Sequence, residues 1–289
     1  MVSKMTDTLL INSPAKINLR LEILGKREDG YHEIRTLLQK ISLYDTIRFS
    51  LRKGRGISIS TNHPSLPVGK ENLVYRAAMM LLGRSDYKGG ISIRIHKGIP
   101  LGAGLGGGSS NAATTLKALN QLLDTSFSQK ELTRLGLEIG ADVPFFLMEG
   151  AAIGTGIGEK LKKVELPHLW YLLINPNFEV STRWAYQNFI LTKRRFHYNI
   201  LKFLRTPSEI SRILRNDLEE VVRAFHPQID RMAEILCSAG AAGALMTGSG
   251  PTVFGVFLEE GSASEAFMKV KRKVKKERWI ILKAESLSV

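Results

Sequence analysis

Cysteine is nearly absent from this 289-residue sequence, in which Cys237 is the single one. One thiol cannot form a disulfide within the chain and cannot make a cysteine-based metal site. Cys237 falls in an apolar helical pattern, so we expect a small buried side chain there. No apolar run approaches the roughly 18 residues needed to cross a bilayer, and the N-terminus lacks a secretory pattern. These absences predict a protein of the reducing cytoplasm.

Acidic residues are also few: the sequence has 27 aspartates and glutamates against 41 lysines and arginines, so its formal net charge is +14. Such a charge is typical either of nucleic-acid binding or of a protein that handles polyanionic small molecules. The densest basic run, residues 269–278, is predicted to lie on a helix with its bases mostly opposite Phe267, Val270 and Val274. That spacing favours a solvated face, so we expect neither a nucleic acid nor a membrane as partner. The six histidines have no metal-ligand spacing, so no metal held by protein side chains alone is expected.

The most informative stretch that is present runs over residues 100–113, and five of the seven positions from Gly102 to Gly108 are glycine. Before it, residues 90–97 alternate in polarity as a strand does. After it, Ser109 and Ser110 are able to cap a helix with apolar periodicity. Backbone N–H groups at a helix start attract anions, and missing Cβ atoms let a phosphate lie on the backbone. The sequence therefore predicts a triphosphate-binding loop here.

Glycine-rich motifs of better-known nucleotide-binding classes fit this loop poorly. The spacing Gly102-x-Gly104-x-x-Gly107 resembles a dinucleotide fingerprint, but a second helix, expected from Ser128, stands where that fold needs a strand ending in an acid. The sequence contains no Walker motif and no protein-kinase catalytic motifs. A flexible turn is the remaining alternative, and three consecutive glycines directly before two capping serines argue against it.

Phosphoryl transfer needs positioning, charge neutralisation and a group that takes a proton from the attacking oxygen. Asp142 lies between a helix end and Pro144 with apolar residues on both sides, which suits a base, although a turn-forming aspartate is the alternative. Lys16 shares the polar face of an alternating strand with Asn18. It could steer Asp142 or stabilise charge on the phosphoryl group, although a lysine that reaches solvent is the alternative. Magnesium could be bound by one of the two loop serines.

Strand and helix patterns alternate in both halves of the chain. The first half is rich in strands, with two or three helices, of which one is expected to start at Asn72 and another at Ser128, where Glu131 completes a capping box. The second half has a split βαβ order. We place a domain boundary near residue 160. The strands expected in the first half cover residues 8–12, 15–23, 34–43, 46–51, 56–61 and 90–97.

Three blocks resemble the motifs of the galactokinase, homoserine kinase, mevalonate kinase and phosphomevalonate kinase superfamily, called GHMP kinases. The first motif is residues 13–18, the second is the glycine loop with its Ser-Ser-Asn-Ala-Ala tail, and the third is residues 246–250. The resemblance implies an α+β fold of two domains. Residues 1–160 would form an ATP-binding domain similar to ribosomal protein S5 domain 2, and residues 161–289 a ferredoxin-like domain.

Three further blocks, residues 25–32, 71–74 and 140–144, narrow the resemblance to GHMP kinases that act in the non-mevalonate route to isoprenoid precursors. The reaction implied is ATP- and Mg²⁺-dependent phosphorylation of the 2-hydroxyl of a cytidine-diphosphate methylerythritol, by a monomer or weak homodimer. A smaller acceptor such as homoserine or a mevalonate derivative is an alternative, and Gly30-Tyr31-His32 argues against it because a small acceptor has no base to stack. A basic nucleic-acid-binding protein with a degenerate nucleotide fold is the other alternative.

The resemblance also implies roles for individual residues. Asp142 would be the catalytic base and Lys16 its partner. Tyr31 and Tyr186 would sandwich the cytosine. The residues implied in nucleotide binding are Asn72, Lys97, Pro100, Gly102, Gly104, Leu105, Gly106, Gly107, Gly108, Ser109 and Ser110. Those implied in substrate binding are Asn18, Tyr31, His32, Tyr186, Thr247, Gly248 and Ser249.

Overall fold

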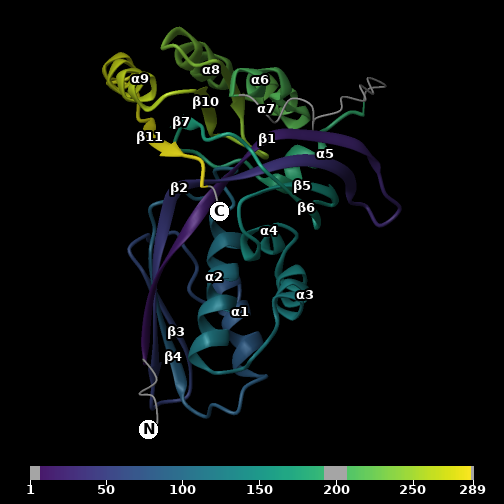
Figure 1. Cartoon of the computed structure of the whole chain (residues 1–289), viewed down its shortest axis with the longest axis vertical. Coiled ribbons are helices and arrows are strands. Elements are labelled where there is room, and N and C mark those ends of the chain that lie inside the picture. The colour runs from purple at the N-terminus through teal and green to yellow at the C-terminus, as the bar shows by residue number, and fades with distance from the viewer. Residues whose placement is uncertain (1–6, 192–206, 288–289) are drawn as a thin grey trace. The chain divides into compact units, whose positions relative to one another are not determined.

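The structure is a computed structural model that describes residues 7–191 and 207–287 (Figure 1). Its residues form two compact units that interleave along the chain. Two long strands, β1 (Thr8–Lys26) and β2 (His32–Arg52), supply residues to both units. The domain boundary expected near residue 160 divides the chain by sequence order and stays a prediction. Unit 1 comprises Met1–Ala15, Leu43–Ile99 and Gly106–Met148, and unit 2 comprises Lys16–Ser42, Pro100–Leu105 and Glu149–Val289.

The sheet of unit 1 has the strand order β3-β4-β2-β1. Strand β3 (Gly56–Thr61) runs parallel to β4 (Gly90–His96), and β4 is antiparallel to β2, with Thr46 opposite His96. Alternation along β4 buries its three isoleucines, as its polarity pattern predicts.

Helices α1 (Leu73–Leu82), α2 (Gly107–Leu122), α3 (Gln129–Ile139) and α4 (Val143–Leu147) belong to the same unit. The three longer helices lie on one side of its strands in Figure 1. Two helix starts expected from the sequence are confirmed. Asn72 caps α1, and Ser128 with Glu131 forms a capping box at α3. Hydrogen bonds from Ser128 lower the pKa of Glu131, so its carboxylate stays charged at the positive end of the helix.

Unit 2 holds two sheets. The first joins β8 (Arg215–Asn216), the unit 2 stretches of β1 and β2, β5 (Ala151–Gly156) and β6 (Lys160–Val164) in that order. The second is antiparallel throughout and has the order β11-β7-β10-β9. Its strands are β7 (Trp170–Asn175), β9 (Gly243–Met246), β10 (Val253–Phe257) and β11 (Ile280–Glu285).

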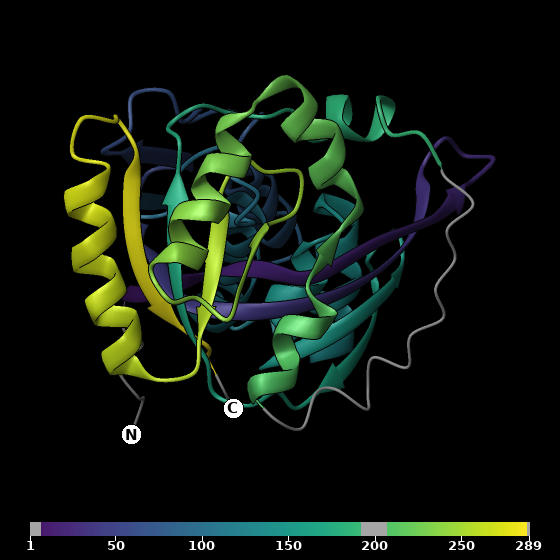
Figure 2. The same cartoon turned by 90° about the horizontal axis from the view of Figure 1, so that it is seen from above.

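The second sheet of unit 2 carries its helices in the order of a split βαβ layout, as the sequence predicts. Helix α8 (Gln228–Ser238) packs on β9 and β10, and α9 (Glu260–Lys273) packs on β7 and β11. Figure 2 shows α9, in yellow, beside the yellow strand β11. The remaining helices of unit 2 are α5 (Thr182–Gln187), α6 (Pro207–Ile213) and α7 (Asp217–Phe225). Among the residues that the structure describes, no helix has the length and apolarity to cross a membrane.

Several expectations are wrong in detail. The pairs of short strands expected over residues 8–23 and 34–51 are single long strands, β1 and β2. Cys237 is exposed rather than buried, because α8 turns Ile229, Met232, Ile235 and Leu236 inward and leaves Cys237 beside that stripe. The exposed basic face is confirmed for the part of the run on α9: Val270 and Val274 are buried in unit 2, whereas the lysines and the arginine between them are exposed. The helix expected over the whole run is too long, because α9 ends at Lys273 and residues 274–278 follow it.

Candidate active site

Helix α2 starts at Gly107 and follows Gly106, which has φ 69° and ψ 16°. This left-handed conformation favours glycine, because a Cβ atom would strain it. The sequence predicts a cap by Ser109 or Ser110, and that prediction is wrong: the turn at Gly106 starts the helix earlier, and both serines lie inside its first turn. The N-cap residue Gly106 supplies no side-chain cap, so the first backbone N–H groups of α2 lack that usual partner. Such a helix start suits a phosphate.

The side chain of Lys97 passes next to this helix start. A Cβ atom added at Gly107 would lie 3.2 Å from Lys97 Nζ and 3.2 Å from Ile99 Cγ2. Lys97 Nζ forms a buried ion pair with Asp45, a residue that is fully buried. The structure therefore brings Lys97 and Gly107 together within unit 1, as the resemblance implies for two nucleotide-binding residues.

Asp45 accepts several hydrogen bonds in this part of unit 1, and the sequence analysis predicts no role for it. Its Oδ1 accepts hydrogen bonds from the backbone N–H groups of Gly98 and Ile99, both at 2.9 Å. Its Oδ2 accepts from Lys97 Nζ and, at 2.8 Å, from Asn111 Nδ2. A fully buried carboxylate needs such partners. The only sequence signal was an aspartate between two apolar strand patterns, which resembles an ordinary turn.

The two serines of the loop have different surroundings. Ser110 is fully buried, and its hydroxyl lies 2.8 Å from that of Ser13, which also receives a hydrogen bond from Thr114. Ser109 is half-buried. Ser109 is therefore the better candidate for an oxygen ligand to a magnesium ion, because Ser110 is part of the core of unit 1.

Asp142 and Asn72 complete the predicted residues of unit 1. Asp142 occupies the N-cap position of α4, in a turn closed by a 3.1 Å hydrogen bond from Val143 N–H to the Gly140 carbonyl, and its side chain does not cap the helix. The Asn72 side chain caps α1 by accepting from Val74 N–H at 2.9 Å and donates to the Pro67 carbonyl at 2.6 Å. The Asn72 side chain thus has a structural role in the helix start, and its role in nucleotide binding stays a prediction.

In unit 2 the first and third motifs meet at Asn18. Lys16 Nζ donates to Asn18 Oδ1 at 2.5 Å, and Asn18 N–H donates to Thr247 Oγ1 at 2.9 Å. All three residues are buried, with Lys16 only 4% exposed. The alternative that Lys16 reaches solvent is therefore wrong. A buried lysine is kept in place by hydrogen bonds, because burial penalises its charge.

The beginning of the glycine loop, Pro100–Leu105, belongs to unit 2 and touches the third motif. The Leu105 carbonyl accepts from Lys16 N–H at 3.0 Å. A Cβ atom at Gly104 would lie 2.2 Å from the Thr247 carbonyl oxygen, so only glycine fits there. Gly248 has φ +57°, and a Cβ atom on it would lie 3.3 Å from Lys16 Nζ. Ser249 Oγ lies 2.9 Å from Thr182 Oγ1.

Two residues at the start of α7 hold the third motif in place, and neither was expected from the sequence. Asn216 Nδ2 donates to the carbonyls of Met246 and Gly248, each at 2.7 Å, while its Oδ1 caps α7. Glu219 accepts from Met246 N–H at 3.0 Å. Burial raises the pKa of Glu219, and this hydrogen bond only partly opposes the shift. An asparagine before an acid-rich first helical turn is a capping signal, but the capping pattern does not reveal its second use.

Three aromatic side chains gather beside the β1–β2 turn in unit 2. The rings of His32 and Tyr186 lie 5.3 Å apart at 31°, and Phe189, which was not expected from the sequence, meets His32 edge-on at 6.4 Å. Burial lowers the pKa of His32, and the charge of Lys26 lowers it further, so its imidazole is neutral near pH 7. Tyr31 is 60% exposed. The structure therefore pairs Tyr186 with His32, and a cytosine between Tyr31 and Tyr186 stays a prediction.

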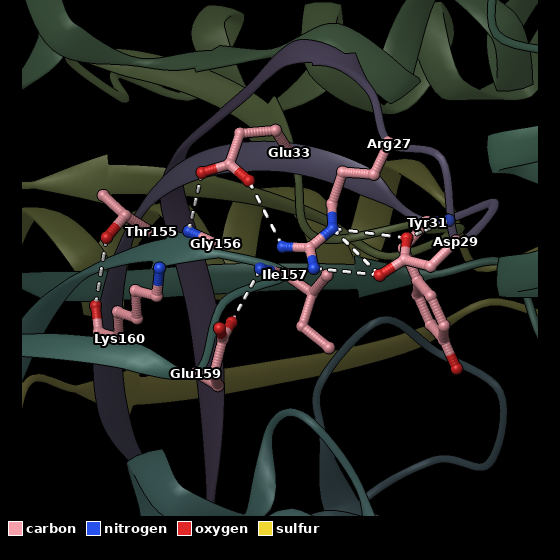
Figure 3. Close-up of polar contacts among 9 residues, drawn as sticks. All are labelled: Arg27, Asp29, Tyr31, Glu33, Thr155, Gly156, Ile157, Glu159 and Lys160. Carbon is pink, nitrogen blue, oxygen red and sulfur yellow. Dashed lines mark hydrogen bonds and ion pairs between the residues drawn. The ribbon is translucent and has the colours of Figure 1, made fainter.

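Ion pairs shape the turn that presents Tyr31 (Figure 3). Arg27 binds Asp29 through Nε and Nη2, with the shortest contact at 2.9 Å, and Asp29 Oδ1 accepts from Tyr31 N–H at 3.1 Å. The hydrogen bond from Arg27 lowers the pKa of Asp29. Glu33 ties the same turn to β5 by accepting from Gly156 N–H at 3.2 Å. In Figure 3 the Tyr31 ring points away from these contacts, which agrees with its exposure.

Comparison with known proteins identifies the class. The model of the GHMP kinases N terminal domain matches residues 72–150, and that of the GHMP kinases C terminal matches residues 198–276. A crystal structure of 4-(cytidine 5'-diphospho)-2C-methyl-D-erythritol kinase superposes with a TM-score of 0.83 at 31% identity and covers 97% of this chain and 100% of that one. A homoserine kinase from Cytophaga hutchinsonii, with a TM-score of 0.77 at 22% identity, shares the fold. The α+β GHMP kinase fold expected from the sequence is confirmed.

Sequence relatives narrow the class. The 4-diphosphocytidyl-2-C-methyl-D-erythritol kinase of Syntrophus aciditrophicus is 51% identical over 261 residues, which cover 89% of this chain and 93% of that protein. The kinase of the same name from Syntrophotalea carbinolica is 48% identical over 255 residues, 88% of this chain and 91% of that protein. The chain belongs to the 4-diphosphocytidyl-2-C-methyl-D-erythritol kinase family.

Proposed function

We propose that this protein transfers the γ-phosphoryl group of ATP to the 2-hydroxyl of 4-diphosphocytidyl-2-C-methyl-D-erythritol, in the non-mevalonate supply of isoprenoid precursors. The observation that carries the proposal is 51% identity to a kinase of that name along nearly the whole length of both chains. In the reaction, the hydroxyl oxygen bonds to the γ-phosphorus, the bond to the β–γ bridging oxygen breaks, and ADP leaves. The hydroxyl proton passes to a base.

The nucleotide is held by the loop that leads into α2. The uncapped N–H groups after Gly106 bind phosphate oxygens. Lys97 keeps its ammonium next to Gly107 by pairing with Asp45, and its remaining donors serve the nucleotide. Magnesium, when bound, neutralises phosphate charge, and Ser109 is the side chain that would contribute an oxygen to it. The phosphates and water would supply its other ligands, because Mg²⁺ takes few from protein.

Asp142 takes the proton from the substrate hydroxyl as the bond to phosphorus forms. Lys16 stabilises the negative charge of the phosphoryl group during transfer. Support for this role of Lys16 comes from its burial and from the 2.5 Å contact with Asn18 Oδ1, which hold its ammonium in one place. A fixed charge acts on a transition state without reorganisation, whereas a solvated lysine would have to be ordered first.

The cytidine end of the substrate is bound in unit 2. A neutral His32 next to Tyr186 offers both an aromatic face and hydrogen-bonding nitrogens. Tyr31 adds an exposed ring on a turn braced by Arg27 and Asp29. Asn18, Thr247, Gly248 and Ser249 bind the remainder of the substrate. These features favour an acceptor that carries a base over a small acceptor such as homoserine.

A coupled assay of ADP release tests the proposal. Wild-type protein with ATP and Mg²⁺ should release ADP in the presence of the cytidyl alcohol, and neither homoserine nor mevalonate should replace it. Asp142→Asn should lower kcat by about 10²–10⁴-fold, since a general base contributes that much. Asp86→Asn, the same change at an exposed position of unit 1, should leave kcat unchanged. An Asp142→Asn protein with wild-type kcat would refute the assigned base, and ADP release with homoserine alone would refute the acceptor.

A further inference from the structure

The donors and acceptors in the hydrogen bonds around Thr36, in unit 2, can be assigned by starting from a group that can only accept. The carbonyl oxygen of Arg20 has no proton to give. Thr36 Oγ1 lies 2.7 Å from it, so the single hydroxyl proton of Thr36 is committed to that bond. Thr36 stands on β2, is 2% exposed, and packs its methyl group against Gly154, where an added Cβ would lie 3.1 Å away.

The same hydroxyl decides which way the Asn18 amide faces. Thr36 Oγ1 lies 2.8 Å from the amide of Asn18 and has only lone pairs left to offer it. The NH2 end of Asn18 must therefore face Thr36. The carbonyl end then points to the other side, where Oδ1 lies 2.5 Å from Lys16 Nζ and 3.4 Å from Thr247 Oγ1. The chain of bonds thus has one direction, from Lys16 through Asn18 and Thr36 to the Arg20 carbonyl.

We propose that Thr36 is a positioning residue for phosphoryl transfer, which acts through Asn18 to hold the Lys16 ammonium. The inference rests on the proposed function in taking Lys16 as the catalytic lysine. Without the Thr36 hydroxyl, the buried NH2 group of Asn18 loses its acceptor, a loss that costs free energy. The Asn18 side chain then has to tilt to bring its NH2 group to another acceptor, because Lys16, which has only protons to offer, cannot be one. That movement takes Oδ1 out of its 2.5 Å contact with Lys16 Nζ, and the ammonium is no longer held in place.

This role predicts that activity and stability respond differently to substitution of Thr36. Thr36→Val keeps the shape and the methyl contact with Gly154 but removes the hydroxyl. Thr36→Ser keeps the hydroxyl but opens a small cavity where the methyl group was. A merely structural threonine would lose kcat only as the folded fraction falls. A positioning threonine loses kcat in the folded protein with valine and regains it with serine.

The experiment measures kcat, both KM values and the unfolding midpoint for wild type, Thr36→Val and Thr36→Ser. Thr252→Val is the matched control, because Thr252 Oγ1 is buried in the same unit and accepts from Asn175 Nδ2 at 2.8 Å. We expect Thr36→Val to lose about 100-fold in kcat, the effect of a misplaced catalytic group. Its KM for ATP should stay within about twofold. Thr36→Ser should remain within about threefold of wild-type kcat, and Thr252→Val should keep wild-type kcat per folded molecule.

A folded Thr36→Val protein with wild-type kcat would overturn the proposal, as would equal losses in the valine and serine variants. If Thr36→Val does not fold, Thr36→Ala at reduced temperature carries the same expectation for kcat. Wild type is assayed in parallel with the cytidyl alcohol, homoserine and mevalonate. Should it prefer another alcohol, the acceptor is wrong and the Thr36 series is judged with that alcohol. A wild type that phosphorylates none of them overturns both proposals.

Discussion

In each unit one buried polar side chain, which we call its hub, holds a lysine: Asp45 holds Lys97 in unit 1, and Asn18 holds Lys16 in unit 2. The two hubs differ in their chemistry. In unit 1 the carboxylate of Asp45 binds Lys97 and Asn111. In unit 2 the amide of Asn18 binds Lys16 and Thr36. A carboxylate accepts at both oxygens, so either orientation serves. An amide accepts at one end and donates at the other, so a neighbour must set its direction. The Asp45 carboxylate therefore needs no neighbour to set its orientation. The Asn18 amide needs Thr36, which accepts from its nitrogen end while its oxygen end binds Lys16.

The largest effect is expected from breaking the charged hub. Asp45→Ala leaves Lys97 and two backbone N–H groups of unit 1 without their acceptor. Removing one partner of a buried ion pair costs about 3–5 kcal/mol of unfolding free energy, which urea denaturation measures. Asp86→Ala, at an exposed position of the same unit, should change it by less than about 0.5 kcal/mol. A loss below about 1 kcal/mol for Asp45→Ala would show that the carboxylate hub is not needed for stability.

A second prediction concerns the Asn216 amide, which uses both of its ends: Oδ1 caps α7 and Nδ2 binds the third motif. Asn216→Ala removes the cap of α7 and both hydrogen bonds to the third motif, which should cost about 2–3 kcal/mol of unfolding free energy. Asn216→Ser restores a cap but not the NH2 group, so it should recover about 1 kcal/mol and leave the rest missing. Full recovery with serine would mean that only the cap matters and that the bonds to Met246 and Gly248 do not.

A third prediction compares two glutamates of unit 2 by their pH dependence. Burial alone would raise the pKa of Glu22, but hydrogen bonds and charges from Arg20 and Arg35 hold it below its ordinary value of 4.5. Its carboxylate therefore adds stability above pH 4.5, and that stability is lost as the pH falls through the lowered pKa. Glu219, whose pKa burial raises, has the opposite sign, because protonation favours its folded form.

Urea midpoints measured across the acid range test this difference. The midpoint of Glu22→Gln should fall less than that of wild type as the pH drops below 4.5. Glu219→Gln should lose the gain in stability that wild type draws from protonating Glu219 above pH 4.5. Parallel curves for wild type and Glu22→Gln would contradict the assigned ion pairs.

The smallest change in unfolding free energy is expected from the removal of a buried hydroxyl that makes no hydrogen bond. Tyr171 is fully buried, and within residues 7–191 and 207–287 its hydroxyl has no hydrogen-bond partner. Burial raises its pKa. Tyr171→Phe removes that unpaired hydroxyl and keeps the edge-on contact with Phe254. The unfolding free energy should stay the same or rise by up to about 1 kcal/mol, and a clear loss in thermal denaturation would indicate a partner for the hydroxyl.

The sequence predicts best what is encoded locally. The caps at Asn72 and Ser128 depend on residues two or three positions away, and both are confirmed. The glycine run also marks the start of α2, but not its cap, because only the backbone shows that Gly106 turns left-handed. The polarity pattern likewise divided β1 and β2 into shorter strands, because it cannot follow a strand through a short polar interruption.

Long-range partners explain what the sequence did not reveal. Asp45 resembles a turn residue until Asn111, 66 positions away, is seen to bind it. Thr36 is one more polar residue in a strand until Asn18 is placed beside it. Asn216 resembles an ordinary cap until the third motif, 30 positions on, is added. The motif residues themselves were found because they occur at fixed spacings in a family.

Phosphorus NMR of the reaction mixture follows the proposed phosphoryl transfer itself. Wild-type protein incubated with ATP, Mg²⁺ and 4-diphosphocytidyl-2-C-methyl-D-erythritol should convert the γ-phosphate signal of ATP into one phosphomonoester signal on the 2-hydroxyl, with ADP formed in equal amount. The appearance of inorganic phosphate alone, or of a phosphomonoester at a different hydroxyl, would contradict the proposed reaction.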